Sequence, residues 1–99
     1  MNEKVIYRYP IKLVEEQEIY INSSGDYDGV KKQILKIDTI RDIPFMWCLV
    51  QPNAPKRKVK LRLYGTGWEM PEDILRQNYL GSFILEDYGE IYHVFIDEV

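Results

Sequence analysis

The sequence predicts a small all-β domain, an antiparallel β-sandwich or barrel of six to seven short strands with at most one short helix. Apolar and polar residues alternate with period two, and no run longer than about seven residues keeps a helical period. Turn signals separate these runs at spacings of about 8–15 residues. Since 99 residues are too few for two cores, we expect one domain over residues 1–99.

Four strands are expected in the N-terminal half, over residues 5–9, 18–21, 33–39 and 45–50. Pro10 ends the first strand, and the turn-forming residues 22–26 close the second. The last of the four is apolar on both faces, which is typical of a central strand. We expect residues 23–30 to form a flexible surface loop.

The next strand follows a turn over residues 51–55, because Pro52 and Pro55 cannot donate hydrogen bonds to a sheet. Residues 58–64 alternate most regularly. One face carries Val59, Leu61 and Leu63, and the other carries Lys60, Arg62 and Tyr64. We expect the second face, basic and aromatic, to be exposed outside the core.

The C-terminal third is expected to hold one short helix and a hairpin. Pro71 suits a first helical position, so residues 71–77 are the only helix predicted. Strands over 79–85 and 91–95 follow, joined by residues 86–89 with Gly89 at the position that needs positive φ.

Charge is distributed unevenly along the chain. Residues 31–62 hold nine basic and two acidic groups, a net charge of +7, whereas residues 63–99 hold one basic and eight acidic groups, a net charge of −7. This acidic counterweight makes general nucleic-acid binding unlikely. We expect the two patches to meet, either within one subunit or between subunits.

The lone Cys48 cannot form an internal disulfide and lies in an apolar run, so we expect a buried, reduced thiol in an intracellular protein. Glu3, Lys4 and Arg8 interrupt any signal-peptide core. The weakly charged run 43–55 contains prolines and is shorter than the ~20 residues of a spanning helix. We therefore expect no export signal and no membrane association.

Catalytic and metal-binding patterns are absent from the sequence. One His and one Cys cannot form the usual zinc site, and no nucleophile motif is present, so we expect neither an enzyme nor a metal or cofactor. His93 shares a strand face with Ile91 and Phe95. It is either a structural ring bonded to a backbone carbonyl, a ligand contact or a general base.

Residues 62–68 are the most informative stretch. Glycines around Thr66 leave backbone amides open to an anion, Arg62 adds guanidinium donors, and Tyr64 and Trp68 offer faces on which a base can stack. The candidate ligand-binding residues are Arg62, Tyr64, Gly65, Thr66, Gly67, Trp68 and His93. The alternative is a tight turn with both rings in the core. The basic run 56–58 is either a funnel for an anion or a solvated edge.

Five blocks resemble a family of small phage-encoded proteins known only as a domain of unknown function. The blocks are residues 47–50 (WCLV), 51–54 (QPNA), 62–67 (RLYGTG), 79–83 (YLGSF) and 92–95 (YHVF). Two features depart from the family: Trp68 stands where members often have His, and the loop over 22–30 is longer. The resemblance implies a phage gene product with a compact β fold that acts in the host cytoplasm.

Three functions are open at this point. The first is a phage anti-defence protein, a sponge that binds and sequesters a cyclic nucleotide of the CBASS pathway without cleaving it. Its pockets would lie between subunits of a dimer or tetramer, because the run 91–96 is apolar on both faces and the opposed charges could pair. The second is a protein-interaction module that docks a partner on Lys60, Arg62 and Tyr64. The third is an enzyme that uses His93 as a base.

Overall fold

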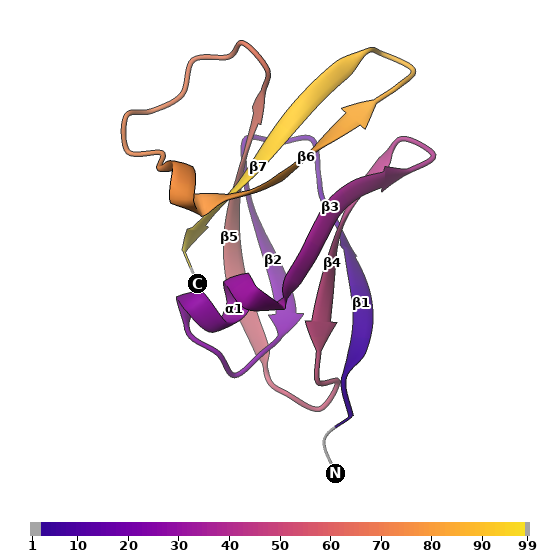
Figure 1. The fold of residues 1–99 in the computed structure, drawn as a ribbon, viewed down its shortest axis with the longest axis vertical. Helices are drawn as coiled ribbons and strands as arrows, with labels where there is room; N and C mark the ends of the chain where they lie inside the picture. Colours follow the sequence, from indigo (N-terminus) through magenta and orange to yellow (C-terminus); the bar gives the residue numbers. More distant parts are fainter. Residues whose placement is uncertain (1–2, 99) are drawn as a thin grey trace.

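The computed structural model describes residues 3–98 and shows seven strands in two antiparallel sheets that face each other (Figure 1). In chain order the elements are β1 (Val5–Pro10), β2 (Glu16–Asn22), α1 (Tyr27–Gln33), β3 (Ile34–Ile40), β4 (Ile43–Val50), β5 (Lys56–Gly65), the 3-10 helix η1 (Arg76–Asn78), β6 (Tyr79–Leu85) and β7 (Glu90–Glu98). The predicted all-β sandwich is confirmed, and every predicted strand is present with bounds shifted by up to three residues.

Sheet A has the strand order β1-β4-β3, and sheet B has the order β2-β5-β7-β6. The sheets come closest where β3 passes β6: a Cβ atom on Gly81 would lie 3.2 Å from Cγ1 of Ile37, so only glycine fits there without a shift. The Asp42 carboxylate links the β3–β4 turn to the β6–β7 turn, because it accepts the backbone N–H groups of Glu86 and Asp87 at 3.0 and 3.2 Å.

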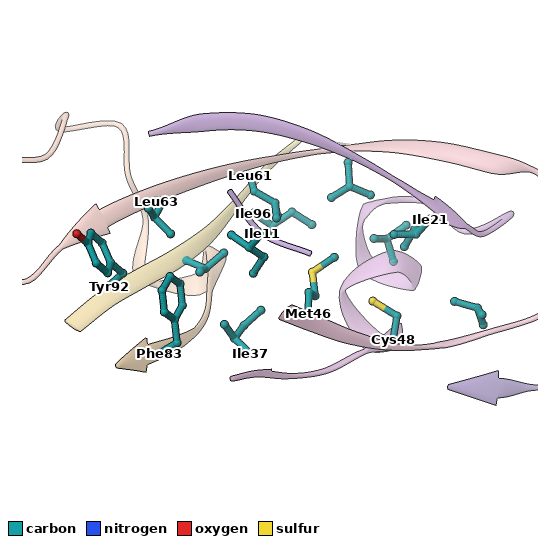
Figure 2. Close-up of a cluster of buried hydrophobic side chains, with 14 of the residues drawn as sticks. Ile11, Ile21, Ile37, Met46, Cys48, Leu61, Leu63, Phe83, Tyr92 and Ile96 are labelled. Carbon is teal, nitrogen blue, oxygen red and sulfur yellow. The ribbon is translucent and has the colours of Figure 1, made fainter. Parts of the chain in front are cut away.

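The core lies between the sheets (Figure 2). Val59, Leu61 and Leu63 are buried on the inner face of β5, as the alternation predicted. In β4 the inner positions include Met46 and Cys48, both fully buried. Burial raises the pKa of the Cys48 thiol to about 12, so the predicted buried thiol is confirmed.

The helix was predicted in the wrong place. Residues 27–30 of the segment expected to be a flexible loop form the first part of α1. The Asp26 side chain caps the first turn by accepting the Gly29 N–H at 2.9 Å, and Val30 anchors the helix in the core. Residues 71–77 form turns and the start of η1 instead. The apolar side chain of Leu75 is 48% exposed, so this segment offers the sheet no apolar stripe to bury.

The turns predicted over residues 51–55 and 86–89 are present. The Ala54 N–H donates to the Gln51 carbonyl at 2.9 Å, and Gly89 in the β6–β7 turn has a φ of +65°. Among residues 3–98, no helix has the length and apolar character needed to cross a membrane.

Candidate functional site

The end of β5 and the turn that follows it form the predicted loop. The Thr66 N–H donates to the Ile91 carbonyl at 2.9 Å, and the Trp68 N–H donates to the Gly65 carbonyl at 3.0 Å. These two amides are therefore already bonded within the protein, and the amide arrangement is that of a tight turn. Gly67, with a φ of +90°, supplies its positive-φ position.

The Trp68 indole lies directly over the backbone of Gly65. A Cβ atom on Gly65 would lie 2.6 Å from both Cε2 and Nε1 of the indole, so the ring can occupy this position only because residue 65 has no side chain. The indole also meets Tyr92 edge-on, with 5.8 Å between ring centroids and an interplanar angle of 90°. Trp68 stays 52% exposed, so about half of its side chain remains in contact with solvent.

One hollow of about 300 Å³ gathers most of the predicted site on the outer face of sheet B. Six of the seven candidates line it, namely Tyr64, Gly65, Thr66, Gly67, Trp68 and His93, together with Met70, Tyr79 and Phe95. The expectation of a pocket between subunits stays a prediction.

His93 is held by two hydroxyl groups. Its Nε2 lies 2.7 Å from Thr66 Oγ1, and its Nδ1 lies 2.9 Å from the Tyr79 hydroxyl. The predicted structural role named a backbone carbonyl as the partner, but both contacts are with side chains. A neutral imidazole donates through one nitrogen and accepts through the other, and a hydroxyl can do either, so both tautomers satisfy this arrangement.

The Thr66–His93 contact has the spacing of a nucleophile and its base, but the other parts of a hydrolytic site are missing from the described chain. Tyr79, rather than a carboxylate, orients the imidazole, and the Thr66 amide that could stabilise an oxyanion is bonded to Ile91.

Tyr64 lines the hollow, whereas Arg62, two residues earlier on β5, does not. Tyr64 is 2% exposed and packs edge-on against Phe95, with 6.1 Å between ring centroids. Arg62 Nε lies 3.3 Å from an Asp97 carboxylate oxygen without hydrogen-bond alignment, and its Nη1 lies 3.5 Å from Asp73. Contact with the Tyr64 hydroxyl and these two carboxylates raises the pKa of Arg62 above its ordinary value.

The expected exposed face of Lys60, Arg62 and Tyr64 is therefore wrong. The chain from residue 66 to residue 79 folds back beside this face (Figure 1), Tyr64 is buried, and both cations are paired. Lys60 Nζ lies 3.8 Å from Asp97 and 3.9 Å from Glu98. Lys60 and Arg62 of the basic third thus pair with acids of the C-terminal third within one subunit.

The outer face of β7 is covered by its own chain only in part: Ile91 is 40% exposed, whereas Phe95 is buried. β7 lies between β5 and β6 in sheet B. Phe95 is only 7% exposed because it packs against Tyr64 and Tyr79, whose ring centroids lie 6.1 and 5.2 Å from its own.

Three lining residues were not predicted. Phe95 could have been found, since it alternates with His93 on one strand face. Tyr79 lies opposite Phe95 in the β6–β7 register, so its place depends on strand pairing. Met70 comes from the irregular segment after the turn, where no periodicity indicates a position.

A second, polar cleft of about 370 Å³ lies at the other end of the molecule, beside α1. The Ser23 hydroxyl donates to Gln33 Oε1 at 2.5 Å, and Gln33 Nε2 donates to the carbonyls of Asn22 and Leu49 at 3.3 and 3.0 Å. These groups bond one another and so tie α1 to both sheets. Within residues 3–98, no cluster of three or more His, Cys, Asp or Glu side chains is placed to hold a metal ion.

The fold and the hollow define the class: a small antiparallel β-sandwich with an aromatic-walled depression on the outer face of one sheet. The chain belongs to the family described as Domain of unknown function (DUF7352), whose model matches residues 2–99. Searches of curated proteins and of solved structures found no match.

Proposed function

We propose that this protein is a phage anti-defence protein that binds a cyclic nucleotide immune signal in the host cytoplasm and sequesters it without cleaving it. The observation that carries the proposal is the hollow beside Trp68, which Trp68, Tyr79 and His93 all line. Flat rings beside a hydroxyl and an imidazole suit a nucleobase, which needs stacking faces and polar partners at its edge.

The charges around the hollow favour recognition of the base over the phosphate. Arg62 already faces Asp97 and Asp73, and the segment beside the hollow carries the exposed acids Glu69 and Glu72. A phosphate bound deep in the site would be repelled by these carboxylates, and no unpaired cation of the described chain beside it would offset the repulsion. We therefore propose that the base enters between the rings and that the phosphates stay in solvent.

The size of the hollow sets how much ligand one protomer takes. About 300 Å³ is at the low end of the ~300–1,000 Å³ range of ligand pockets. That volume suits one base with part of its sugar. Each protomer would hold one unit of a cyclic di- or trinucleotide, and the rest of the ring would remain outside.

The test is to incubate purified protein with a panel of cyclic di- and trinucleotides, remove unbound ligand, denature the protein and identify what is released. Release of intact ligand supports sequestration. Release of a cleaved product would support an enzyme, and retention of no panel member would overturn the proposal.

Two matched variants locate the site. Since stacking contributes about 1–3 kcal/mol per base, Trp68→Ala should weaken binding about 5- to 150-fold. Tyr88→Ala removes a 74% exposed ring outside the hollow and should leave binding unchanged. Equal losses in both variants would place the ligand elsewhere.

A second candidate is a phage accessory module that binds a protein and no nucleotide. The apolar outer face of sheet A favours it, because Ile6 and Ile43 are 59% and 53% exposed there. This candidate predicts that the protein retains no cyclic nucleotide of the panel. It also predicts that polar substitutions on that face abolish binding of the partner protein.

A further inference from the structure

The outer face of sheet A is apolar, and no other element of the described chain lies over it. Its centre is the alternate row of β4 residues Phe45, Trp47 and Leu49, all half-buried, and Ile43 extends the row at one end. Leu35, which bulges out of β3 at the register shift, and Ile40 border it at 49% and 40% exposure. A contiguous apolar patch of this kind marks an interaction surface.

Two cations lie over aromatic rings of this surface. Arg8 Cζ is 4.5 Å from the centroid of the Phe45 ring, and Lys36 Nζ is 4.9 Å from a Trp47 ring centroid. The two rings meet edge-on, with 5.7 Å between their centroids. These contacts restrict the rotamers of the two cations and the two rings, so little side-chain entropy remains to be lost when a partner binds.

The β3–β4 register makes the surface complementary to a second copy of itself. Ile37 pairs with Met46 at the centre, with the Lys36–Trp47 pair on one side and the Asp38–Phe45 pair on the other. Consider a two-fold axis that lies between the two copies and runs perpendicular to the strands at Ile37. It places the Lys36 side of one copy over the Asp38 side of the other. Lys36, whose Nζ already lies 3.5 Å from Asp38 Oδ2 of its own chain, then also faces Asp38 of the second copy, so the two ion pairs form a group of four alternating charges. Trp47 faces Phe45 of the second copy.

The ends of the surface match under the same operation. The Ile40–Ile43 pair meets the end of the second copy that carries Leu35 and Leu49, so apolar rows cover apolar rows. A two-fold axis parallel to the strands would instead lay β1 over β3 and bring Arg8 onto Lys36, which is repulsive. The charge pattern therefore selects one orientation.

We propose that two copies of this chain associate face to face through the outer faces of sheet A, with Lys36 of each facing Asp38 of the other. Three strands about 4.8 Å apart and about 25 Å long cover roughly 350 Å² per copy, against about 800 Å² in a standard interface. The dimer is therefore reversible on dilution. Both hollows lie on the opposite sheet and stay open, so the proposal stands independently of the nucleotide.

Sedimentation velocity from low micromolar to near-millimolar protein tests the proposal. The mass should rise with concentration from the monomer value of 11.8 kDa toward that of a dimer. A monomer throughout this range would overturn the proposal. So would a mass that grows without limit, since a two-fold interface closes.

A charge exchange tests the orientation. Asp38→Lys places like charges at two symmetric contacts between the copies and also replaces the ion pair with Lys36 within each chain. The change within the chain is present in monomer and dimer alike, so the contacts between copies should raise the dissociation constant by about tenfold or more. Adding Lys36→Asp restores the opposite charges and the dimer. Asp28→Lys on α1 makes the same charge change away from the surface and should have no effect. An Asp38→Lys variant that dimerises normally, or a double variant that stays monomeric, overturns the assigned geometry.

A third variant guards against misfolding of the charge variants. Ile43→Ser alters a side chain that is 53% exposed in the monomer, so its circular dichroism and melting temperature should match those of the wild type while the dimer weakens. An unchanged dissociation constant in this correctly folded variant would also overturn the proposal.

Discussion

Substitution of Gly65 by alanine should displace the Trp68 indole and destabilise the domain. The new Cβ atom would lie 2.6 Å from indole Cε2 and Nε1, about 1 Å inside the closest comfortable contact of ~3.5 Å. The backbone of Gly65 is fixed by its pairing with Tyr92 in β7. The indole, carried on a turn and half exposed, is therefore the group that has to move.

The structure bounds the size of this effect. A fully buried Trp hides up to about 250 Å². Trp68 is 52% exposed, so about 120 Å² of it is hidden, equivalent to about 3 kcal/mol at ~25 cal/mol per Å². Complete displacement sets this upper limit, and a tilted ring that keeps its edge contact with Tyr92 would lose less. We expect Gly65→Ala to lower the free energy of unfolding by about 1–3 kcal/mol.

Urea unfolding measures the loss, and a double-mutant cycle assigns it to the indole. In a Trp68→Ala background the Gly65→Ala cost should nearly disappear. Gly67→Ala is the control: it meets no atom within 4 Å but has a φ of +90°, so its cost should be the same in both backgrounds. In a Trp47→Phe background, the Trp68 emission should also shift to the red with Gly65→Ala. An equal Gly65→Ala cost with and without Trp68 would refute the reasoning.

Two further predictions concern titratable groups. Because burial raises the pKa of Cys48 to about 12, the native thiol should resist alkylation at pH 8 and react fully once urea unfolds the chain; fast modification of folded protein would contradict this. A hydrogen bond with the Asp42 carboxylate and repulsion from it raise the pKa of Asp87 above its ordinary value of 3.8. The folded state therefore holds this proton more tightly than the unfolded state does, so the stabilisation is full at acid pH and is lost as pH rises through the raised pKa. Asp87→Asn should gain stability relative to the wild type as pH rises across that window, and a pH-independent difference would rule this out.

Much of the strand pattern could be predicted because it depends on local alternation. Val59, Leu61 and Leu63 share a face in any strand that contains them, and a sheet with one buried side has to turn that face inward. Gly89 marks a hairpin for the same local reason. The helix α1 escaped prediction, since seven residues with the single buried anchor Val30 show no period that could be read.

The candidate site could be predicted only in part. The glycines, Thr66 and Trp68 form a contiguous segment with recognisable chemistry, and His93 joins them because β7 pairs with the end of β5. Arg62 and Tyr64 belong to the same segment, but their roles depend on Asp97, on Asp73 and on a stretch of irregular chain that covers them.

The sequence by itself determined which residues form strands, which side of each strand is apolar and which turn carries the site's polar and aromatic groups. These features depend on backbone geometry within a few residues. The tertiary structure decided that Lys60 and Arg62 pair with acids of the C-terminal third inside one subunit, that Tyr64 lies beneath the hollow, and that the outer apolar face of β4 is left without a cover. These outcomes depend on which distant strands pair and on where the irregular segment after Gly67 folds, and no local pattern encodes that choice.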